Sequence, residues 1–323
     1  ANYAVIPRSF FFQNNSDKAA IKFSDVTSQV NAELSNIGMV TAAIWTDFNN
    51  DTWPDLMVVG EWMPIRIFQN EKGKLVAREG LVPGMESTGW WCSLFPADVD
   101  KDGDMDYFLG NAGLNLQFKA TEKEPVQLTA GDFNNDGVLD PIVSYYVKGK
   151  TYPLASRDEL LEQITSLRKK FIKYEDYANA TIQDIATEEQ LEKSYRFKAA
   201  TLRSCWLENI EGRTFNLKYL PEMAQFSSVN GFVHEDFDGD GENELLVAGN
   251  FFPFKSQLGR SDASTGLILD FENGDFRERG QISNVWLTGD IRDIALLQFK
   301  NGAKRIVVSR NNDSPSVFLV KER

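Results

Sequence analysis

The chain has 323 residues, of which 42% are hydrophobic, so it can bury a large core, and its length allows roughly two or three domains. Its formal net charge of -13 argues against a nucleic-acid partner, because a surface this acidic repels phosphate. No signal peptide, transmembrane run or lipidation motif occurs. Because the chain starts at Ala1 without an initiator Met, we expect a mature or trimmed part of a longer protein, with a neighbouring segment outside this chain.

The first expected elements are two strands, at 8–12 and 21–26, which have no inner partner in the sequence. They fit either a ring closed by strands from both termini or the tail of a preceding repeat. The first complete unit follows, with strands at 39–46, 55–60, 64–69 and 74–78. Four short strands in succession predict one blade of a β-propeller.

Between the first two strands of this unit lies an acidic loop whose pattern occurs four times in the chain. Each copy has Asp, Asn or Glu at loop positions 1, 3, 5 and 9, so their side-chain oxygens can surround one cation together with the position 7 carbonyl. All-oxygen ligation of this kind suits Ca2+. The expected calcium ligands are Asp47, Asn49, Asp51 and Asp55, then Asp98, Asp100, Asp102 and Asp106, then Asp132, Asn134, Asp136 and Asp140, and finally Asp236, Asp238, Asp240 and Glu244.

Charge supports this interpretation of the loops. Two carboxylates about 4 Å apart repel by roughly 4 kcal/mol at an effective dielectric constant near 20, so empty loops should be strained or disordered. Four calcium ions would bring the net charge from -13 to about -5, and we therefore attribute most of the acidity to metal ligation.

The EF-hand is the competing calcium loop. Three of the four copies share its Gly at position 6, but position 12, which an EF-hand fills with a bidentate Glu, is Val58, Leu109, Val143 or Val247. A short apolar run follows each loop and predicts a buried strand, so each loop joins two strands. The first loop is expected to be the weakest site, because Thr52 replaces the Gly and a β-branched residue tolerates a left-handed backbone poorly.

The later units differ in length. The second loop lies close to the third, so the outer strands of the second unit, around 113–120, are expected to be reduced. The fourth unit is complete, with outer strands at 266–270 and 275–279. A fifth unit begins at Asp290, but its loop, which starts at Gln298, lacks acids and is expected to bind no metal.

The hydrophobic period changes from 2 to 3.6 between residues 156 and 195, which predicts two or three helices inserted in the third blade. Ser156 and Glu159 form a capping box at the first helix. The insertion is either a packing lid or a partner-binding element, and it carries the main basic cluster of the chain, Arg168, Lys169, Lys170 and Lys173. We therefore predict an all-β fold, a single β-propeller domain over 1–323 with four-stranded blades, five of them visible, and a small helical insertion at 156–195.

Two cysteines, Cys92 and Cys205, lie in apolar stretches far apart in the sequence. A disulfide framework is excluded, and we expect two buried thiols, although a single bridge stays open.

The loops followed by apolar strands resemble the FG-GAP and VCBS-repeat β-propellers, a group that includes the integrin α head and many bacterial surface proteins. The stretches 60–64, 110–115, 144–158 and 248–250 are most similar to the propeller part of long exported bacterial proteins, often encoded near outer-membrane glycan-uptake systems. The resemblance implies calcium at the loop residues and a location outside the cell, at its surface or in the periplasm. Family propellers often have seven blades, so the size of the intact ring is left open.

Segments that follow each second strand or precede each first strand should gather on one face near the central channel. Those preceding a first strand are 87–91, 225–228 and 290–292. Aromatic rings, amides and charged groups in these segments suit sugar binding, unless Trp62, Trp90 and Trp91 only pack between blades. The expected ligand-binding residues are Glu61, Trp62, Trp90, Asn111, Asn250 and Arg310. Gly60, Gly110 and Gly249, at the ends of the second strands, are interpreted as permitting tight turns.

Catalysis has little support in the sequence. His234 is the only histidine and is interpreted as a strand residue, and no nucleophile or zinc set is recognisable, so we name no catalytic residue. The favoured hypothesis is a calcium-stabilised, non-catalytic binding module of an exported or surface protein, which recognises a glycan or a protein. The alternatives are a calcium-dependent polysaccharide lyase, with Arg260 or Arg310 as base, and a structural scaffold that docks through the helical insertion.

Overall fold

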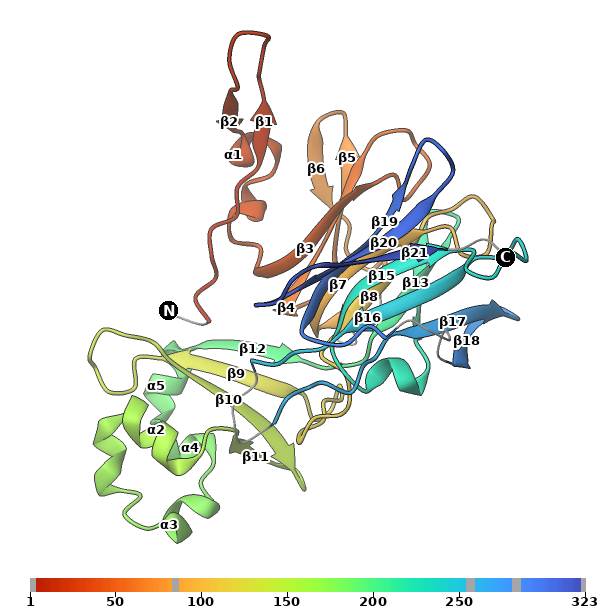
Figure 1. Ribbon diagram of the computed structural model, residues 1–323. Coiled ribbons are helices and arrows are strands. Elements are labelled where there is room, and N and C mark those ends of the chain that lie inside the picture. Colours follow the sequence, from red (N-terminus) through yellow and green to blue (C-terminus); the bar gives the residue numbers. More distant parts are fainter. Residues whose placement is uncertain (1–3, 83–86, 254–258, 281–285, 321–323) are drawn as a thin grey trace.

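The computed structural model describes residues 4–82, 87–253, 259–280 and 286–320, and it has an all-β, propeller-like fold with few helices (Figure 1). Four antiparallel sheets, which we call blades A to D, form a curled arc. Blade A contains β3 (Met39–Thr46), β4 (Asp55–Met63), β5 (Arg66–Glu71) and β6 (Lys74–Ala77). Blade B contains β7 (Gly89–Ala97), β8 (Asp106–Asn111), β13 (Cys205–Ile210) and β14 (Thr214–Tyr219). Blade C contains β15 (Val229–Glu235), β16 (Glu244–Gly249), β17 (Leu267–Glu272) and β18 (Asp275–Gly280), and blade D contains β19 (Ile291–Gln298), β20 (Lys304–Arg310) and β21 (Ser316–Val320).

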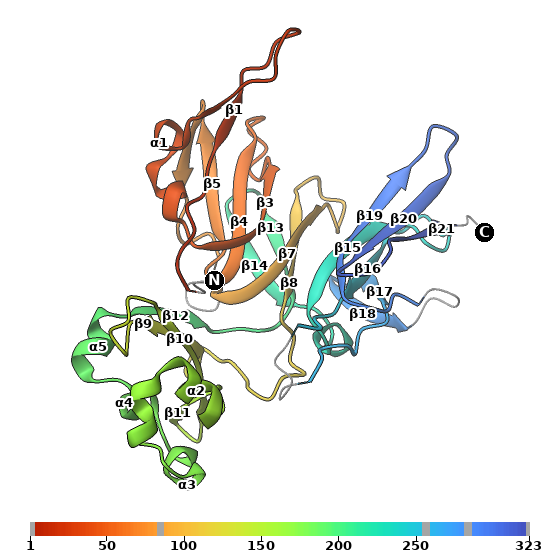
Figure 2. The same ribbon diagram turned by 60° about the vertical axis from the view of Figure 1, so that its left-hand side comes forward.

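The inner strands β3, β7, β15 and β19 contact one another in that order, and Figure 2 shows that the arc stays open between blades A and D. Neighbouring blades share apolar cores because each strand buries alternate side chains against the next sheet. Trp91 and Tyr107 belong to the core between blades A and B, Phe108 and Phe232 to the core between B and C, and Ile294 to the core between C and D. The end of β4 also pairs with the start of β7, which joins blades A and B into one sheet.

A sheet with helices is inserted into blade B between β8 and β13. We call residues 112–204 the inserted unit. It contains β9 (Val126–Gly131), β10 (Asp140–Val147), β11 (Lys150–Pro153) and β12 (Tyr195–Ala199), together with α2 (Arg157–Gln163), α3 (Tyr174–Ala178), α4 (Ile182–Ile185) and α5 (Glu188–Lys193). The strand order is β11-β10-β9-β12, so the last strand returns beside the first. The helices, with the 3-10 turn Thr165–Lys169, pack around Leu160, Ile164 and Phe171.

This insertion corrects two expectations about the second and third units. Residues 113–120 form no strand, and the outer strands of blade B are β13 and β14, which follow the inserted unit in the sequence. The third metal loop therefore lies in an inserted sheet and not in a blade in series with the others. The ends of the insertion meet, since Gly113 N donates to Leu202 O at 2.8 Å and Asn111 N donates to Ser204 Oγ at 3.0 Å.

At the N-terminal end, β1 (Phe12–Asn14) and β2 (Phe23–Asp25) form a hairpin that projects from the arc (Figure 2). The short helix α1 (Thr27–Val30) and the 3-10 turns Ala32–Asn36 and Glu222–Gln225 complete the elements that we describe. The strand expected at 21–26 is thus present in shortened form as β2, whereas β1 shares only Phe12 with the strand expected at 8–12. No helix in the described part of the chain is long and apolar enough to cross a membrane.

Each inner strand of the arc contains a register shift near its start, at Thr41, Cys92, Asn230 and Arg292. The shifts lie opposite Gly60, Gly110 and Gly249 in blades A, B and C. A Cβ at these glycines would lie 2.2 Å from Met39 O, 2.0 Å from Val229 O and 1.8 Å from Ser228 O, respectively. These three glycines do not have positive φ, so they permit close backbone approach and not the tight turn that we expected. In the inserted unit, β9 and β10 pair without such a shift.

Candidate functional site

The four metal loops share one hydrogen-bonded frame. The position 9 carboxylate accepts from the position 2 N–H in every copy, at 3.3, 3.0, 3.0 and 2.8 Å. The position 5 carboxylate accepts from the position 7 N–H at 2.8 Å in each. Positions 4 and 6 have left-handed backbones in all four loops, including Thr52 at φ 71°. The loops therefore adopt one conformation despite their different sequences.

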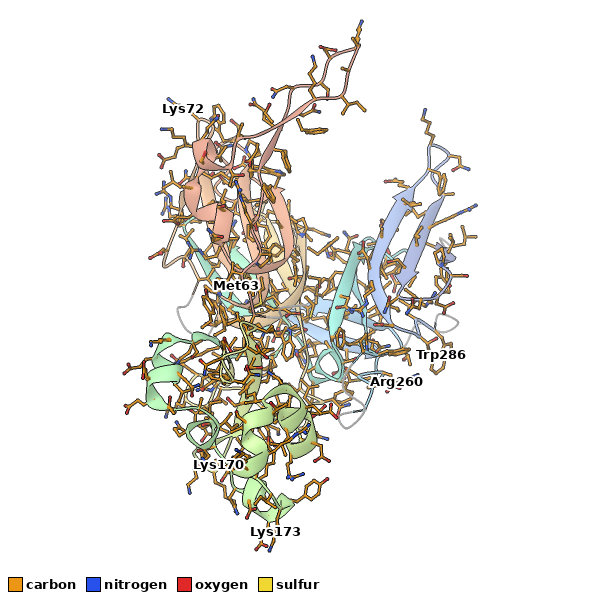
Figure 3. All side chains as sticks on the ribbon, turned by 90° about the vertical axis from the view of Figure 1, so that its left-hand side faces the viewer. Met63, Lys72, Lys170, Lys173, Arg260 and Trp286 are labelled. Carbon is orange, nitrogen blue, oxygen red and sulfur yellow. The ribbon has the colours of Figure 1, made fainter. Side chains whose placement is uncertain are left out.

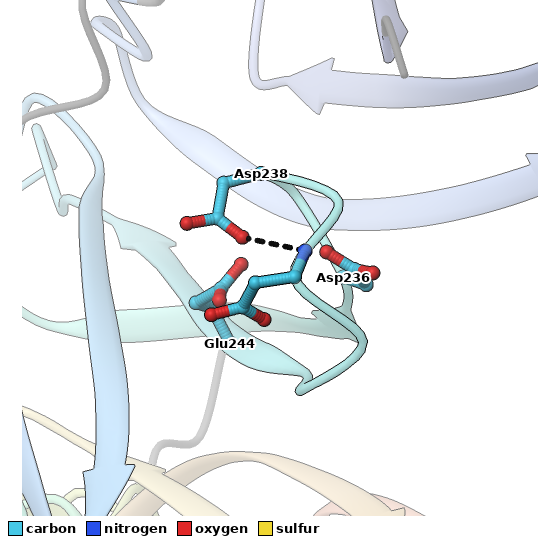
Figure 4. Close-up of side chains that lie close together, drawn as sticks. Asp236, Asp238 and Glu244 are labelled. Carbon is cyan, nitrogen blue, oxygen red and sulfur yellow. Dashed lines mark hydrogen bonds between the residues drawn. The ribbon is translucent and has the colours of Figure 1, made fainter. Parts of the chain in front are cut away.

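The fourth loop gathers its acids most closely. Oxygens of Asp236, Asp238, Asp240 and Glu244 all lie within 4.8 Å of one another (Figure 4). Arg279 of blade C lies beside this cluster, and its Nη1 is 2.8 Å from Asp238 Oδ2 and 3.1 Å from Glu244 Oε1. The guanidinium partly balances the acids, so this site carries its own positive charge.

The second loop forms a similar cluster from Asp98, Asp100 and Asp106. Asp98 Oδ1 is buried and has no hydrogen-bond partner, whereas the position 1 acids of the other loops accept backbone N–H bonds at 2.8 to 3.0 Å. Leaving a buried carboxylate oxygen without a partner is costly. Three convergent carboxylates with one orphan oxygen fit a hard cation such as Ca2+.

The first and third loops have Asn at position 3, and no cluster of three acids within 4.8 Å forms there among the described residues. Their acids instead bond to loop N–H groups, as when Asp47 accepts from Asp51 and Thr52 and Asp132 accepts from Asp136 and Gly137. The third loop also lies on the inserted unit, away from the arc (Figure 1).

Burial shapes the protonation of the position 9 acids. It raises the pKa of Asp55 to about 6 and that of Asp106 to about 7, and the nearby loop acids add to the effect. Burial also raises the pKa of Asp140 and Glu244. A cation held by these loops would favour the ionised form of such groups, so its binding would release protons.

A second site lies on the axis of the arc, where the four register shifts meet. A pocket of about 180 Å³ is lined by Thr41, Glu61, Trp90, Cys92, Ala112, Ser228, Asn230, Phe251 and Arg292. Each of blades A to D thus contributes the side chain at its shift, and bulges characteristically redirect side chains in this way. We call this the axial pocket. It confirms that segments preceding the first strands and following the second strands converge.

Hydrogen bonds fix the bulged side chains across blade boundaries. Thr41 Oγ1 donates to Trp91 O at 2.9 Å, and Asn230 Nδ2 donates to Ile291 O at 2.7 Å. By contrast, Ser228 is only 3% exposed, and its buried hydroxyl has no hydrogen-bond partner. A buried hydroxyl without a partner in a pocket wall is a group that a bound ligand can satisfy.

Two charged side chains from the described part of the chain line the axial pocket, Glu61 and Arg292. Arg292 Nη2 lies 3.0 Å from Asp290 Oδ2, and its guanidinium stacks over the Phe251 ring with 5.0 Å between the carbon and the centroid. Burial raises the pKa of the Cys92 thiol to about 12, with Glu61 adding to the effect and Arg292 opposing it. Cys92 is thus a neutral thiol at pH 7. Both it and Cys205 are free, so no disulfide links them.

Of the six expected ligand-binding residues, Glu61 and Trp90 line the axial pocket. The other four have partners elsewhere. Trp62 packs beneath the inserted unit, Asn111 and Asn250 are buried and hydrogen-bonded, and Arg310 donates to Thr288 O and Ser316 Oγ.

The sequence analysis did not predict the residues at the four register shifts as pocket residues, although the sequence contains a signal for them. Thr41, Cys92 and Asn230 each stand six positions before the first acid of a metal loop, and Arg292 stands six before Gln298 of the acid-free loop. This repeat position holds four different residue types in otherwise apolar strands. Such variety indicates that core packing does not determine the residue type there.

The remaining candidates lie outside the axial pocket. His234 lines a separate hollow beside the fourth metal loop. Arg260 lies over the Phe252 ring, with 5.0 Å between the guanidinium carbon and the centroid. Lys170 and Lys173 are exposed on the inserted unit, on the side away from the blades (Figure 3).

In a comparison with known proteins, a family model matches one part of the chain. Residues 47–109 match the model of the FG-GAP-like repeat and span the first two metal loops. No curated protein sequence matches the chain. The solved structures that match include the following two. The V. cholerae biofilm matrix protein Bap1 has 12% identity and a TM-score of 0.30, over 97% of this chain and 68% of that one. An Agrocybe aegerita lectin, solved to explain recognition of non-reducing terminal N-acetylglucosamine, has 13% identity and a TM-score of 0.22, over 90% and 83%. Residues 47–109 are thus an FG-GAP-like repeat, and the loop spacing of that repeat recurs at residues 132–140 and 236–244.

Proposed function

We propose that the chain is a calcium-stabilised, non-catalytic binding module whose axial pocket recognises a glycan. The observation that carries this proposal is the pocket, because four separate blades direct one side chain each to the same point on the axis. The walls combine an aromatic ring, a carboxylate, a guanidinium and a hydroxyl without a partner. Sugars are bound by such mixtures of flat apolar surface and hydroxyl partners.

Calcium enters the proposal as a structural cation. Asp98, Asp100 and Asp106, and likewise the four acids of the fourth loop, supply convergent oxygens of the kind that Ca2+ prefers. When bound, the ion would neutralise the acids and hold each loop between its two strands. Sites with affinities of about 10⁻⁴ to 10⁻³ M are filled by calcium outside cells, so we infer an extracellular, cell-surface or periplasmic location.

Catalysis is not part of the proposal. A lyase needs a base at the substrate, and neither Arg260 nor Arg310 lines the axial pocket. The acids near the fold's surface loops have a simpler role as cation ligands.

A glycan array probed with the purified protein tests the binding function. We expect hits in millimolar calcium that weaken in EDTA, because loss of the ions loosens the loops that hold the inner strands. The Lys169→Glu and Lys170→Glu double variant, changed on the inserted unit, should keep the same hits. Two results together would contradict glycan binding at the axial pocket: an array that stays blank in calcium, and loss of capture of a protein partner in the double variant. Recognition would then be assigned to the inserted unit.

The calcium role predicts the effect of chelation on thermal stability. A ligand that binds only the folded state stabilises it by about 2.7 kcal/mol at one hundred times its dissociation constant, so EDTA should lower the melting temperature by about 5 °C or more. Calcium should restore it and equimolar magnesium should not, since Mg2+ demands a tighter octahedral shell. An unchanged melting temperature in EDTA, with no calcium found by elemental analysis, contradicts the role.

A further inference from the structure

We propose that the Arg279 side chain competes with Ca2+ for the carboxylates of the fourth metal loop, so that this loop binds calcium more weakly than the second loop does. This inference rests on the calcium role proposed above and ranks two of the sites. Three observations carry it: the backbone that directs Arg279, the groups that it contacts, and the different surroundings of the second loop.

A β-bulge directs Arg279 toward the fourth loop. Ile268 of β17 lies opposite Gly280 of β18. The next residue of β17, Leu269, lies opposite Glu278, so the pairing passes over Arg279, which is the extra residue of β18. An extra residue of this kind changes the direction in which its side chain points. The irregularity in the outer pair of blade C thus falls at the residue that reaches the loop acids.

Arg279 joins two expected ligands of the fourth loop to a carboxylate outside the loop. Its Nη1 lies 2.8 Å from Asp238 Oδ2 and 3.1 Å from Glu244 Oε1, the acids at loop positions 3 and 9. Its Nε lies 3.1 Å from Oδ2 of Asp270 on β17. The Glu244 side chain is only 4% exposed, so salt screens this contact less than a surface pair. The guanidinium therefore balances part of the negative charge of the loop from within the protein.

The second loop has four acids and a different arrangement of cations. Among the residues that the structure describes, no Lys or Arg forms an ion pair with these acids. The ammonium of Lys101, at position 4 of this loop, lies instead 2.5 Å from Glu242 of the fourth loop. Asp98 Oδ1 is buried without a hydrogen-bond partner. A divalent cation in the second loop thus meets carboxylates that no side-chain cation has neutralised, which favours its binding.

Calcium binding at the fourth loop has a cost that the second loop does not have. The ion either displaces Arg279 from Asp238 and Glu244 or shares them with its positive charge, and both reduce affinity. Asp270 can hold a displaced guanidinium, because it is already paired with Arg279 Nε and its Oδ1 is buried without a partner. Two parallel bonds between a guanidinium and a carboxylate are a favourable arrangement. Arg279 can therefore stay beside the loop in both states.

Isothermal titration of calcium into chelator-treated protein measures the affinities of the loops. Asp102→Asn removes an expected ligand of the second loop, and Asp240→Asn removes the corresponding ligand of the fourth, so each affinity is assigned from what its variant loses. We expect the second loop to bind calcium about tenfold or more tightly than the fourth.

Variants of Arg279 test the competition directly. Arg279→Gln should tighten calcium binding at the fourth loop about tenfold and leave the second loop unchanged. The matched control is Arg277→Gln on the same strand, where Nε lies 3.9 Å from Glu272 in an exposed pair, and it should leave both affinities unchanged.

Thermal melts of the same proteins give a second readout. In EDTA, Arg279→Gln should melt below wild type, because the loop acids lose their internal cation, and saturating calcium should remove that difference. Arg279→Lys, which keeps the charge and loses the forked contact, should bind calcium with intermediate affinity, and it serves if Arg279→Gln does not fold.

The outcomes separate this inference from the proposed calcium role. If the wild-type protein binds no calcium, both fail. If the fourth loop binds calcium as tightly as the second, or if the Arg279 variants bind it like Arg277→Gln, the calcium role stands and competition by Arg279 is overturned.

Discussion

Position 6 of each metal loop has a left-handed backbone, which three loops fill with glycine and the first fills with Thr52 at φ 71°. A β-branched residue is strained in this conformation. The cost is local to the loop, because the Thr52 N–H still donates to Asp47 Oδ2 at 2.8 Å as the glycines do in the third and fourth loops.

Replacing Thr52 by Gly should therefore stabilise the protein. Relief of about 1–2 kcal/mol of strain exceeds the additional chain entropy of glycine, about 0.5–1 kcal/mol, so we expect a net gain of about 0.5–1 kcal/mol in the free energy of unfolding. Urea denaturation in calcium measures it. Thr52→Ala, which keeps the Cβ, should gain less, and a Thr52→Gly protein less stable than wild type contradicts the assignment of strain.

His234 gives the stability a dependence on pH. Burial lowers its pKa, with Lys101 acting in the same direction and Glu235 and Asp98 opposing. Since the unfolded residue titrates near 6.5, the folded state binds fewer protons below that pH. Its contribution is complete above about pH 6.5 and is lost as the pH falls, by at most about 1.4 kcal/mol per pH unit.

The His234→Gln variant isolates this contribution, because the loop acids titrate in both proteins. Between pH 7.5 and pH 5.0, the melting temperature of wild type should fall further than that of the variant. Parallel pH profiles for the two proteins would show that His234 does not titrate differently on folding.

At the scale of elements, Asn209 of β13 ties blades A and B together. Its Nδ2 donates to Phe48 O at 2.8 Å and to Met105 O at 3.2 Å, and its N–H donates to Asp106 Oδ1 at 2.8 Å. One buried side chain thus holds the first and second metal loops to the strand that completes blade B.

Asn209→Ala should lower the free energy of unfolding by about 2–3 kcal/mol, because it leaves the buried carbonyl of Phe48 and the partly buried carbonyl of Met105 without their donor. Chemical denaturation with calcium present measures the loss. The matched control is Asn216→Ala on the exposed side of β14, where the amide donates to Glu208, and it should cost less than about 0.5 kcal/mol. Equal losses in the two variants would contradict a linking role for Asn209.

The sequence alone predicts local features well and pairing partners poorly. Loop spacing and apolar runs predicted the metal loops and the strands of blades A, C and D, since these depend on neighbouring residues. The outer strands of blade B were not predicted, because β8 pairs with β13 across the whole inserted unit and no local pattern records that choice. The axial pocket was predicted in part, because Glu61 and Trp90 are recognisable by type, whereas Thr41 and Cys92 face it only through register shifts.

At the scale of the molecule, the N-terminal segment covers the outer face of blade A only in part. A groove of about 410 Å³ runs over it, lined mainly by apolar residues that include Phe11, Val40, Trp45 and Val58, and Trp45 is 52% exposed. Apolar surface of this kind binds hydrophobic dyes.

We therefore expect the native protein to enhance the fluorescence of 1-anilinonaphthalene-8-sulfonate, and Trp45→Gln to reduce that enhancement by at least half. Trp286→Gln is the control, because Trp286 is more exposed, at 61%, and does not line the groove. Dye fluorescence at the level of buffer alone, or equal effects of the two variants, would contradict a binding groove on blade A.

The insertion in blade B has a consequence for the order of folding. Strands β7 and β8 leave the ribosome before the inserted unit, and β13 and β14 leave after it. At about 5–20 residues per second, residues 112–204 take on the order of 10 s to synthesise. During that time β8 presents an unpaired edge, which is open to pairing with a wrong strand. Blade B is thus begun before the inserted sheet and completed after it, and the time needed to synthesise residues 112–204 sets the interval in which nascent chains can mispair.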